Sequence, residues 1–234
     1  MTGTRRALFA ALALLAAIGF AALGVWQVER RAWKLDLIAR VEARIHAAPA
    51  PLPERRDWSR LDAQSYEYRR VRVSGAFRHD RETLVQALTE RGAGWWVLTP
   101  LTTSGGTVLV NRGFVPQDRR DPATRAAGQS ASPVTVTGLM RVSEPHGGFL
   151  RANDPVAGRW YSRDVAAIAR ARRLGAVAPF FIDADPAPNP GGYPIGGLTV
   201  VQFRNSHLVY ALTWFALAAL SGGAAILVLR GGRR

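Results

Sequence analysis

Two long apolar stretches lie at opposite ends of the chain. Residues 7–25 form the first stretch, and the second begins after His207 and runs to Leu229 without a charge. Crossing a lipid bilayer takes roughly 20 mostly apolar residues in a helix. The pattern therefore predicts two transmembrane helices, over residues 7–25 and 207–229, and places residues 26–206 outside the bilayer.

Helical spacing continues after the first apolar stretch. Trp26, Arg30 and Trp33 fall on one side of a helix, because positions three or four residues apart share a face. We expect the helix to extend over residues 26–44. The clustered prolines that follow cannot continue a helix, so they predict an extended, exposed linker over residues 46–60.

A period of two begins at Tyr68. Alternating apolar and polar positions are typical of half-buried β-strands. Residues 159–175 return to helical spacing, with Ser162 as the expected N-cap and Gly175 as the stop. The sequence thus predicts a membrane protein in which two transmembrane α-helices flank one extramembrane α+β domain, mostly antiparallel sheet. The predicted strands are RVRVSGAF, TLVQALT, GWWVLTPLTT, TVLVNRGF and VTVTGLMRV, followed by APFFIDAD and LTVVQFRN.

Composition narrows the class of protein. The formal charge is +14, almost all of it from arginine, because Lys34 is the only lysine. No block of like charge is long enough for a nucleic-acid tail, so we expect no nucleic-acid partner and assign the basicity to the surface of the lipid bilayer and to protein partners. The chain contains no cysteine, which removes disulfides, thiolate nucleophiles and iron–sulfur ligation.

The charges that flank the apolar stretches bear on topology. Arg5 and Arg6 give the first stretch the outline of a signal peptide, but its length exceeds the roughly 7–15 apolar residues of such a segment, which favours an uncleaved anchor. Arginines near both termini predict cytoplasmic ends, whereas Arg30, Arg31 and Lys34 argue locally for the reverse. Long domains cross largely regardless of charge. We expect a multi-pass protein of a bacterial inner membrane with a periplasmic central domain, rather than a mitochondrial protein.

An ionisable side chain lies at the entrance of the second span. On a helix, His207, Tyr210 and Trp214 share one face. One interpretation is an aromatic belt, because tyrosine and tryptophan concentrate at membrane surfaces. The other is a functional site, because imidazole is a common ligand of haem iron, and flat aromatic rings suit a porphyrin. In that case Arg204 could pair with the carboxylates of the porphyrin.

A second group lies where the first helix leaves the bilayer. In one interpretation, Trp26 and a snorkelling Arg30 form a membrane anchor. In the other, they line a site shared with His207, since small residues such as Gly24 and Gly222 let the two spans pack closely. The sequence leaves both interpretations open.

Other polar residues of the central domain are interpreted as structural. Asn111-Arg112-Gly113 is predicted to end a strand and enter a turn, with Gly113 at positive φ and Arg112 projecting from the sheet edge. Asp183 and Asp185 share a strand face, but no third group completes an acid–base site, so we expect solvated strand-end side chains. No motif of a hydrolase, metalloprotease or nucleotide-binding enzyme occurs, and we expect a protein that is not an enzyme. Surface positions are expected for His46, His79 and His146.

Eight segments in a fixed order resemble one family. They are LGVWQVERRAWK, RRVRVSGAF, GWWVLTPL, VLVNRGFVP, RWYSRDVAAIAR, PFFIDAD, PIGGLT and RNSHLVYALTW. Their order between two terminal spans resembles the Surfeit locus protein 1 family over residues 23–214. The resemblance implies a factor for assembly of haem–copper terminal oxidases such as cytochrome c oxidase, complex IV of the respiratory chain. Its bacterial members look like haem a binding proteins that assist insertion of the cofactor into oxidase subunit I.

The resemblance also implies a site and partners. A histidine at the start of the second span belongs to the family pattern and maps onto His207, which would ligate the iron of haem a. The expected partners are oxidase subunit I and the haem a synthase. The other residues expected at the haem a site are Tyr210, Trp214 and Trp26, with Arg30, Arg112 or Arg204 for the propionates.

Two other functions stay open at this point. A cofactor-free membrane scaffold would bind subunit I or the haem a synthase through the sheet domain and never touch haem. A periplasmic enzyme would use Asp183 and Asp185 as its catalytic carboxylates.

Overall fold

The computed structural model describes residues 2–148 and 150–231. Within them the chain forms two compact units. The helical unit comprises residues 2–42 with 201–231, and the sheet domain comprises residues 43–200. Two terminal helices that are long and apolar enough to cross a membrane therefore flank a sheet-rich domain, which confirms the predicted fold class.

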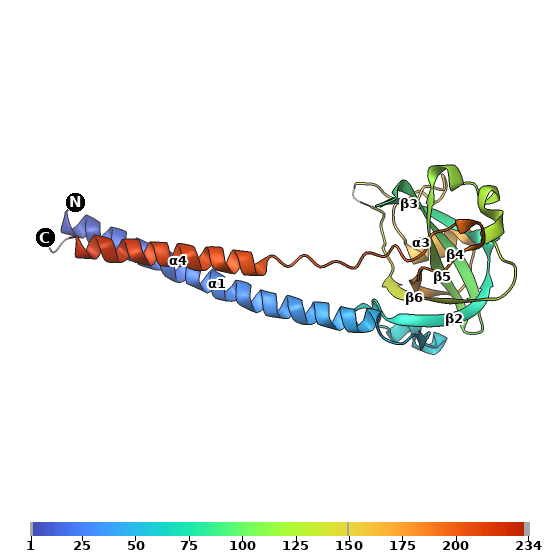
Figure 1. The fold of residues 1–234 in the computed structure, drawn as a ribbon, viewed down its shortest axis with the longest axis horizontal. Coiled ribbons are helices and arrows are strands. Elements are labelled where there is room, and N and C mark those ends of the chain that lie inside the picture. The colour runs from blue at the N-terminus through green and yellow to red at the C-terminus, as the bar shows by residue number, and fades with distance from the viewer. Residues whose placement is uncertain (1, 149, 232–234) are drawn as a thin grey trace. The chain divides into compact units, whose positions relative to one another are not determined.

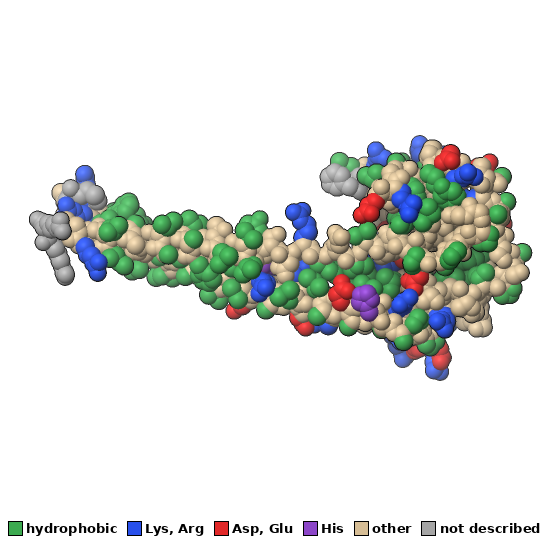
Figure 2. Space-filling model, in the orientation of Figure 1, with side chains coloured by type: hydrophobic (Ala, Val, Ile, Leu, Met, Phe, Trp, Pro, Cys, Tyr) green, Lys and Arg blue, Asp and Glu red, His purple; other side chains and the backbone are tan. Residues whose placement is uncertain are grey.

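The helical unit is an antiparallel pair. Helix α1 spans Gly3–Ile45 and helix α4 spans His207–Arg230. Figure 1 shows them side by side, with both chain termini at the same end. Small residues allow this close approach: Gly24 is buried, and a Cβ there would lie 2.6 Å from the ring of Phe215. Hydrophobic side chains cover much of the visible face of the pair (Figure 2), as a lipid-facing surface requires.

The sheet domain contains seven strands and several short helices. The strands are β1 Ala50–Pro51, β2 Arg70–Phe77, β3 Thr83–Thr89, β4 Gly92–Thr103, β5 Gly106–Pro116, β6 Val134–Val142 and β7 Val177–Ala184. The helices are α2 Ala63–Tyr66 and α3 Val165–Arg172, with 3-10 turns η1 Arg55–Arg60, η2 His79–Arg81, η3 Gln117–Arg119, η4 Pro122–Gly128 and η5 Pro190–Gly192.

The sheet closes into a small barrel. Its strand order is β1-β2-β6-β7-β5-β4-β3, and β2 also pairs with β4. That second pairing joins Ala76 to Thr102 and Phe77 to Leu101. Strands β2, β6, β7, β5 and β4 therefore form a ring, with β3 continuing the sheet beyond β4. Among the described strands, β1 with β2 and β5 with β7 pair in parallel, and the other pairings are antiparallel.

The alternation along the ring strands separates two hydrophobic clusters. On β5, Val108 and Val110 belong to the cluster inside the barrel together with Phe180 of β7. Leu109, between them, belongs to a second cluster outside the ring with Ile168 of α3. Successive strand residues face opposite sides of a sheet. The same alternation places Asn111 on the outer side of β5 and Arg112 on the side of the barrel interior.

Two predicted elements differ in the structure. The prediction of a strand at LTVVQFRN is wrong, because an alternating pattern forms a strand only where a neighbouring edge accepts its hydrogen bonds, and the described chain supplies none to residues 198–205. The predicted N-cap of α3 is also wrong. Asp164 caps the helix by accepting from the backbone N–H of Ala167 at 2.9 Å, whereas Ser162 accepts from the backbone N–H of Gly147.

Residues 46–60, expected as an exposed linker, instead pack on the barrel in part. Ala50 of β1 pairs with Val71 of β2. Trp58 of η1 meets Phe180 edge to face, with ring centroids 6.2 Å apart. The prolines prevent a long helix here, as predicted. Apolar side chains of this segment, such as Leu52 and Trp58, pack against the core of the barrel.

Candidate functional site

His207 begins helix α4 and lies against helix α1 within the helical unit. Its Nδ1 is 2.7 Å from Oε1 of Gln27. An amide oxygen only accepts hydrogen bonds, so Nδ1 carries a proton and donates a hydrogen bond to Gln27. In this tautomer the lone pair is on Nε2. Metal-binding histidines are typically oriented by such a hydrogen bond from the other ring nitrogen, so this pair has the chemistry of a metal ligand and its positioning residue.

The predicted aromatic neighbours of His207 are distributed along the helical pair. Tyr210 and Trp26 are 55% and 50% exposed, so both rings are available at the surface of the unit. Trp214 lies seven residues from His207 on α4, about 10 Å along a helix axis. Its ring stacks on Phe20 at a centroid distance of 5.6 Å. Trp214 therefore takes part in helix packing, and a role for it at a cofactor stays a prediction.

Cations lie near the same pair of residues. Arg30 and Lys34 on α1 each lie over an aromatic ring, at 4.6 and 5.0 Å from the ring centroids. Arg204 is exposed in the segment that precedes α4. Guanidinium groups form strong hydrogen bonds to carboxylates. The positions that flank His207 and Gln27 along both helices therefore carry groups that could meet an anionic ligand.

The segment around Gly113 is a bulge inside β5. Trp96 pairs with Phe114 and Leu98 pairs with Asn111, so β5 holds one more residue than β4 between these pairs. The positive φ expected of Gly113 is confirmed at 127°. The predicted strand end is wrong, because the extra residue is absorbed by the bulge and the strand continues.

Arg112 lies in the sheet domain and does not project from a sheet edge. Its side chain is buried, and its Nη2 donates to the carbonyl oxygen of Gly128 at 2.5 Å and to Oδ1 of Asn189 at 3.3 Å. The prediction that Arg112 projects from the sheet edge is wrong, because β5 has a neighbouring strand on each side, β4 and β7. Any role of Arg112 toward a haem propionate stays a prediction.

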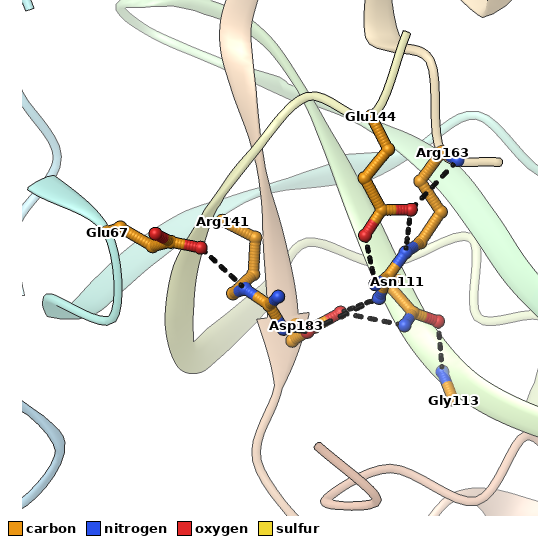
Figure 3. Close-up of polar contacts among 7 residues, drawn as sticks. All are labelled: Glu67, Asn111, Gly113, Arg141, Glu144, Arg163 and Asp183. Atoms are coloured by element: carbon orange, nitrogen blue, oxygen red, sulfur yellow. Dashed lines mark hydrogen bonds and ion pairs between the residues drawn. The ribbon is translucent and has the colours of Figure 1, made fainter. Parts of the chain in front are cut away.

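The other side of β5 carries a buried network of charges. Asn111 donates to Oδ1 of Asp183 at 2.8 Å, and Arg141 and Arg163 donate to the same carboxylate at 2.9 and 3.2 Å. Arg163 also pairs with Glu144 at 2.5 Å. Figure 3 shows these side chains converging from β5, β6, β7 and the segment before α3. The network therefore ties three ring strands and the start of a helix together.

The expected solvated position of Asp183 is wrong. Its side chain is 3% exposed, because β7 is a central strand between β6 and β5 and its end is covered on both sides. Asp185 is partly exposed and pairs with Arg70 at 2.5 Å. Both carboxylates are thus held by arginines, as structural ion pairs are. The described residues also contain no group of three or more His, Cys, Asp or Glu side chains suited to a metal ion.

His79, expected at the surface, is half-buried. Its Nε2 lies 3.1 Å from the carbonyl oxygen of Ser130 and therefore donates a proton, which leaves the lone pair of Nδ1 facing Arg112 at 3.4 Å. Burial lowers the pKa of His79, and the positive charges of Arg112 and Arg125 lower it further, against the Ser130 hydrogen bond and Glu82, which raise it. The folded state therefore holds His79 neutral.

This lowered pKa predicts a loss of stability in mild acid. The unfolded chain takes up the proton near pH 6.5, its ordinary value, while the folded state resists it. The contribution of neutral His79 is present above pH 6.5 and is lost as the pH falls through the lower folded pKa. Urea midpoints at pH 7.5, 6.5 and 5.5 should fall more steeply for the wild type than for His79→Gln. Parallel pH profiles would contradict the assignment.

The observations define a class of protein: a small β-barrel domain joined to two membrane-spanning helices, with an oriented histidine at the start of the second helix. The sequence matches the SURF1 family model over residues 14–219. The chain belongs to the SURF1 family, whose members are known as assembly factors of cytochrome oxidase and are not enzymes by name.

Individual relatives agree with this assignment. Surfeit locus protein 1 of Homo sapiens is 40% identical over 217 residues, which cover 84% of this chain and 69% of the relative. The Mus musculus protein of the same name is 40% identical over 225 residues, covering 89% and 71%. A SURF1-like protein of Monosiga brevicollis is 38% identical over 213 residues, covering 85% and 79%.

Proposed function

We propose that this protein assists assembly of a haem–copper terminal oxidase by binding haem a through His207 and helping its insertion into oxidase subunit I. Membership in a family of cytochrome oxidase assembly factors supports the oxidase part of the proposal. The observation that carries the haem part is the 2.7 Å contact between Nδ1 of His207 and Oε1 of Gln27. A hydrogen bond of this kind supports the proposal because it orients the ring through one nitrogen and leaves the other, Nε2, as the atom that would ligate the iron.

The side chains of the helical unit fit haem a. Bound haem a supplies an iron that accepts an imidazole and a porphyrin with an apolar tail, which suits a helix surface rich in hydrophobic side chains. Gln27 keeps the proton on Nδ1 of His207. Arg30 and Arg204 supply the guanidinium groups that would pair with the propionates. The exposed ring of Tyr210, and that of Trp26 beside Gln27 on α1, offer flat apolar surface near the ligand.

The proposal extends to location and partners. We place the two helices in a bacterial inner membrane with the sheet domain on the periplasmic side, and we name oxidase subunit I and the haem a synthase as partners. The length and apolar composition of α1 and α4 support the membrane location. A cofactor-free scaffold would share these partners, so only a measurement of haem separates the two functions.

The test is the visible absorption of the full-length protein purified in detergent from cells that make haem a. Wild-type protein should carry a haem a spectrum, and His207→Ala should lose it, because the iron loses its protein ligand. His146→Ala, which removes an exposed histidine of the sheet domain, should keep the spectrum. Absence of haem from the wild type, in cells where the same protein restores oxidase assembly, would favour the scaffold.

Gln27→Leu tests the positioning role separately. Loss of a residue that orients a metal ligand typically lowers metal affinity about 10–100-fold. We expect the variant to bind haem a weakly, with a shifted absorption spectrum, whereas Gln27→Glu should retain binding because its carboxylate still accepts from Nδ1. Unchanged affinity in Gln27→Leu would show that this contact does not prepare the ligand.

A further inference from the structure

A pocket of about 350 Å³ opens at one end of the barrel. This volume lies in the range of small-molecule sites, about 300–1,000 Å³, and the mouths of β-barrels are frequent positions for them. Its wall is formed by the ends of β2, β6 and β7, by the middle of β5 and by the loops that contain Gly128 and Asn189. The apolar side chains of the wall include Phe77, Val110, Val134, Val136, Ala184 and Pro188.

Arg112 is the positively charged group at the inner wall of this pocket. It faces the barrel interior, two positions after Val110 on β5, and its side chain is 6% exposed. Its guanidinium lies 4.9 Å above the ring of Phe77 and donates to Gly128 and Asn189. All of these partners are neutral. A guanidinium has five N–H donors, so the contacts to two oxygens and to the His79 ring leave hydrogen-bonding capacity for a ligand.

The positive charge of Arg112 has no carboxylate partner within residues 2–148 and 150–231. The negative charge of Glu82 raises the pKa of Arg112. However, the Glu82 carboxylate accepts hydrogen bonds from both terminal nitrogens of the buried Arg125. Asp185, which also lines the pocket, is held by Arg70 at 2.5 Å. Burial lowers the pKa of Arg112 to about 10. A buried charge is unfavourable unless it is paired.

Other arginines with little exposure in the same domain are paired with carboxylates. Arg125 forms a two-pronged pair with Glu82, and Arg141 and Arg163 share the carboxylate of Asp183. Arg112 differs from them in being buried against neutral acceptors beside an open cavity. An anion in that cavity would complete the pairing that the described part of the chain does not provide.

We infer that the pocket at the barrel mouth binds a small organic carboxylate, with the carboxylate against Arg112 and an apolar body against the strand ends. This site lies in the sheet domain and does not depend on haem a binding at His207. The carboxylate could belong to a free aliphatic acid or to the propionate of a porphyrin, which have the same chemistry at this arginine.

The inference is tested with pentanoate on the full-length protein in lipid nanodiscs, by titration calorimetry and saturation-transfer NMR. Pentanamide has nearly the same shape without the charge and serves as the matched ligand. Pentanoate should bind at least tenfold more tightly than pentanamide, because only the acid forms a charge-assisted pair. Equal affinities, or no binding of pentanoate, would overturn the inference.

Two variants locate the binding. Arg112→Gln removes the charge and keeps a donor for Gly128, and it should weaken pentanoate binding at least tenfold. Because this buried change could impair folding, Ala187→Trp provides an independent test: Ala187 is exposed at the pocket and its enlargement narrows the entrance. Ala157→Trp, at an exposed alanine outside the lining, should bind normally. Normal binding by folded Ala187→Trp would overturn the inference.

A competition experiment distinguishes the two sources of the carboxylate. Metal-free mesoporphyrin carries two propionates and cannot be ligated by His207 through iron. Displacement of pentanoate from both the wild type and His207→Ala would assign the pocket to a porphyrin side chain. Retention of pentanoate would assign it to a free aliphatic acid. Loss of haem binding in His207→Ala with pentanoate binding intact would separate this site from the haem a proposal.

Discussion

Asp183→Asn is expected to destabilise the sheet domain by about 3–5 kcal/mol, the size typical of removing one partner from a buried ion pair. The carboxylate holds both Arg141 and Arg163, and its own side chain is only 3% exposed while those of the arginines are 15% exposed. Asparagine fits the same space but leaves two guanidinium groups without their shared counter-charge. Because a domain is stable by only about 5–15 kcal/mol, the loss would be a large share of the total.

A denaturant titration of the full-length protein in detergent, followed by tryptophan fluorescence, measures this effect. Asp185→Asn is the matched control, since Asp185 is two residues away along the chain and pairs with the partly exposed Arg70. Partly exposed pairs contribute about 0–1 kcal/mol. Equal losses in the two variants would show that burial of the Asp183 network does not determine its strength.

Gly113→Ala is expected to destabilise the domain by roughly 2–6 kcal/mol. A side chain at φ 127° is strained, at about 1–3 kcal/mol. In addition, a Cβ at this position would lie 2.0 Å from the carbonyl oxygen of Ile195, and overpacking of this kind costs about 1–3 kcal/mol. The obstacle is the backbone of Ile195, which exchanges hydrogen bonds in both directions with Phe114. Neither β5 nor the loop that contains Ile195 can therefore move away freely.

The same denaturant titration compares Gly113→Ala with Gly158→Ala. Gly158 also has a positive φ, 65°, but no atom within 4 Å of the position of a Cβ. A residue other than glycine in this left-handed region costs about 1–2 kcal/mol. The excess loss in Gly113→Ala measures the collision with Ile195. If both variants lose the same stability, the bulge tolerates a side chain and the close approach is not required.

The elements of this fold were predictable where their signals are local. The length of two apolar runs indicates membrane helices, and a period of two indicates the strands from β2 to β7. Closure of the barrel was not predictable, because it depends on Ala76 and Phe77 meeting Thr102 and Leu101. Alternation says which face of a strand is apolar, but it does not say which strand edges meet.

In the candidate site, too, local signals were predictable and contacts between distant residues were not. His207 could be selected from its position at the start of a span. Its contact with Gln27, 180 positions away along the chain, depends instead on how the two helices pack. The partners of Asp183 lie 72, 42 and 20 positions away along the chain, at Asn111, Arg141 and Arg163. No spacing rule links such residues, and so the sequence suggested a solvated strand end.

The contact between Gln27 and His207 also has a consequence for folding. Pairing of α1 with α4 joins the two chain segments on either side of the sheet domain, so the domain is a loop with its ends already held together. A closed loop has fewer unfolded conformations than a chain with free ends, and this entropic gain rises slowly with loop length. The membrane helices thus act on the barrel as a crosslink would, without a covalent bond.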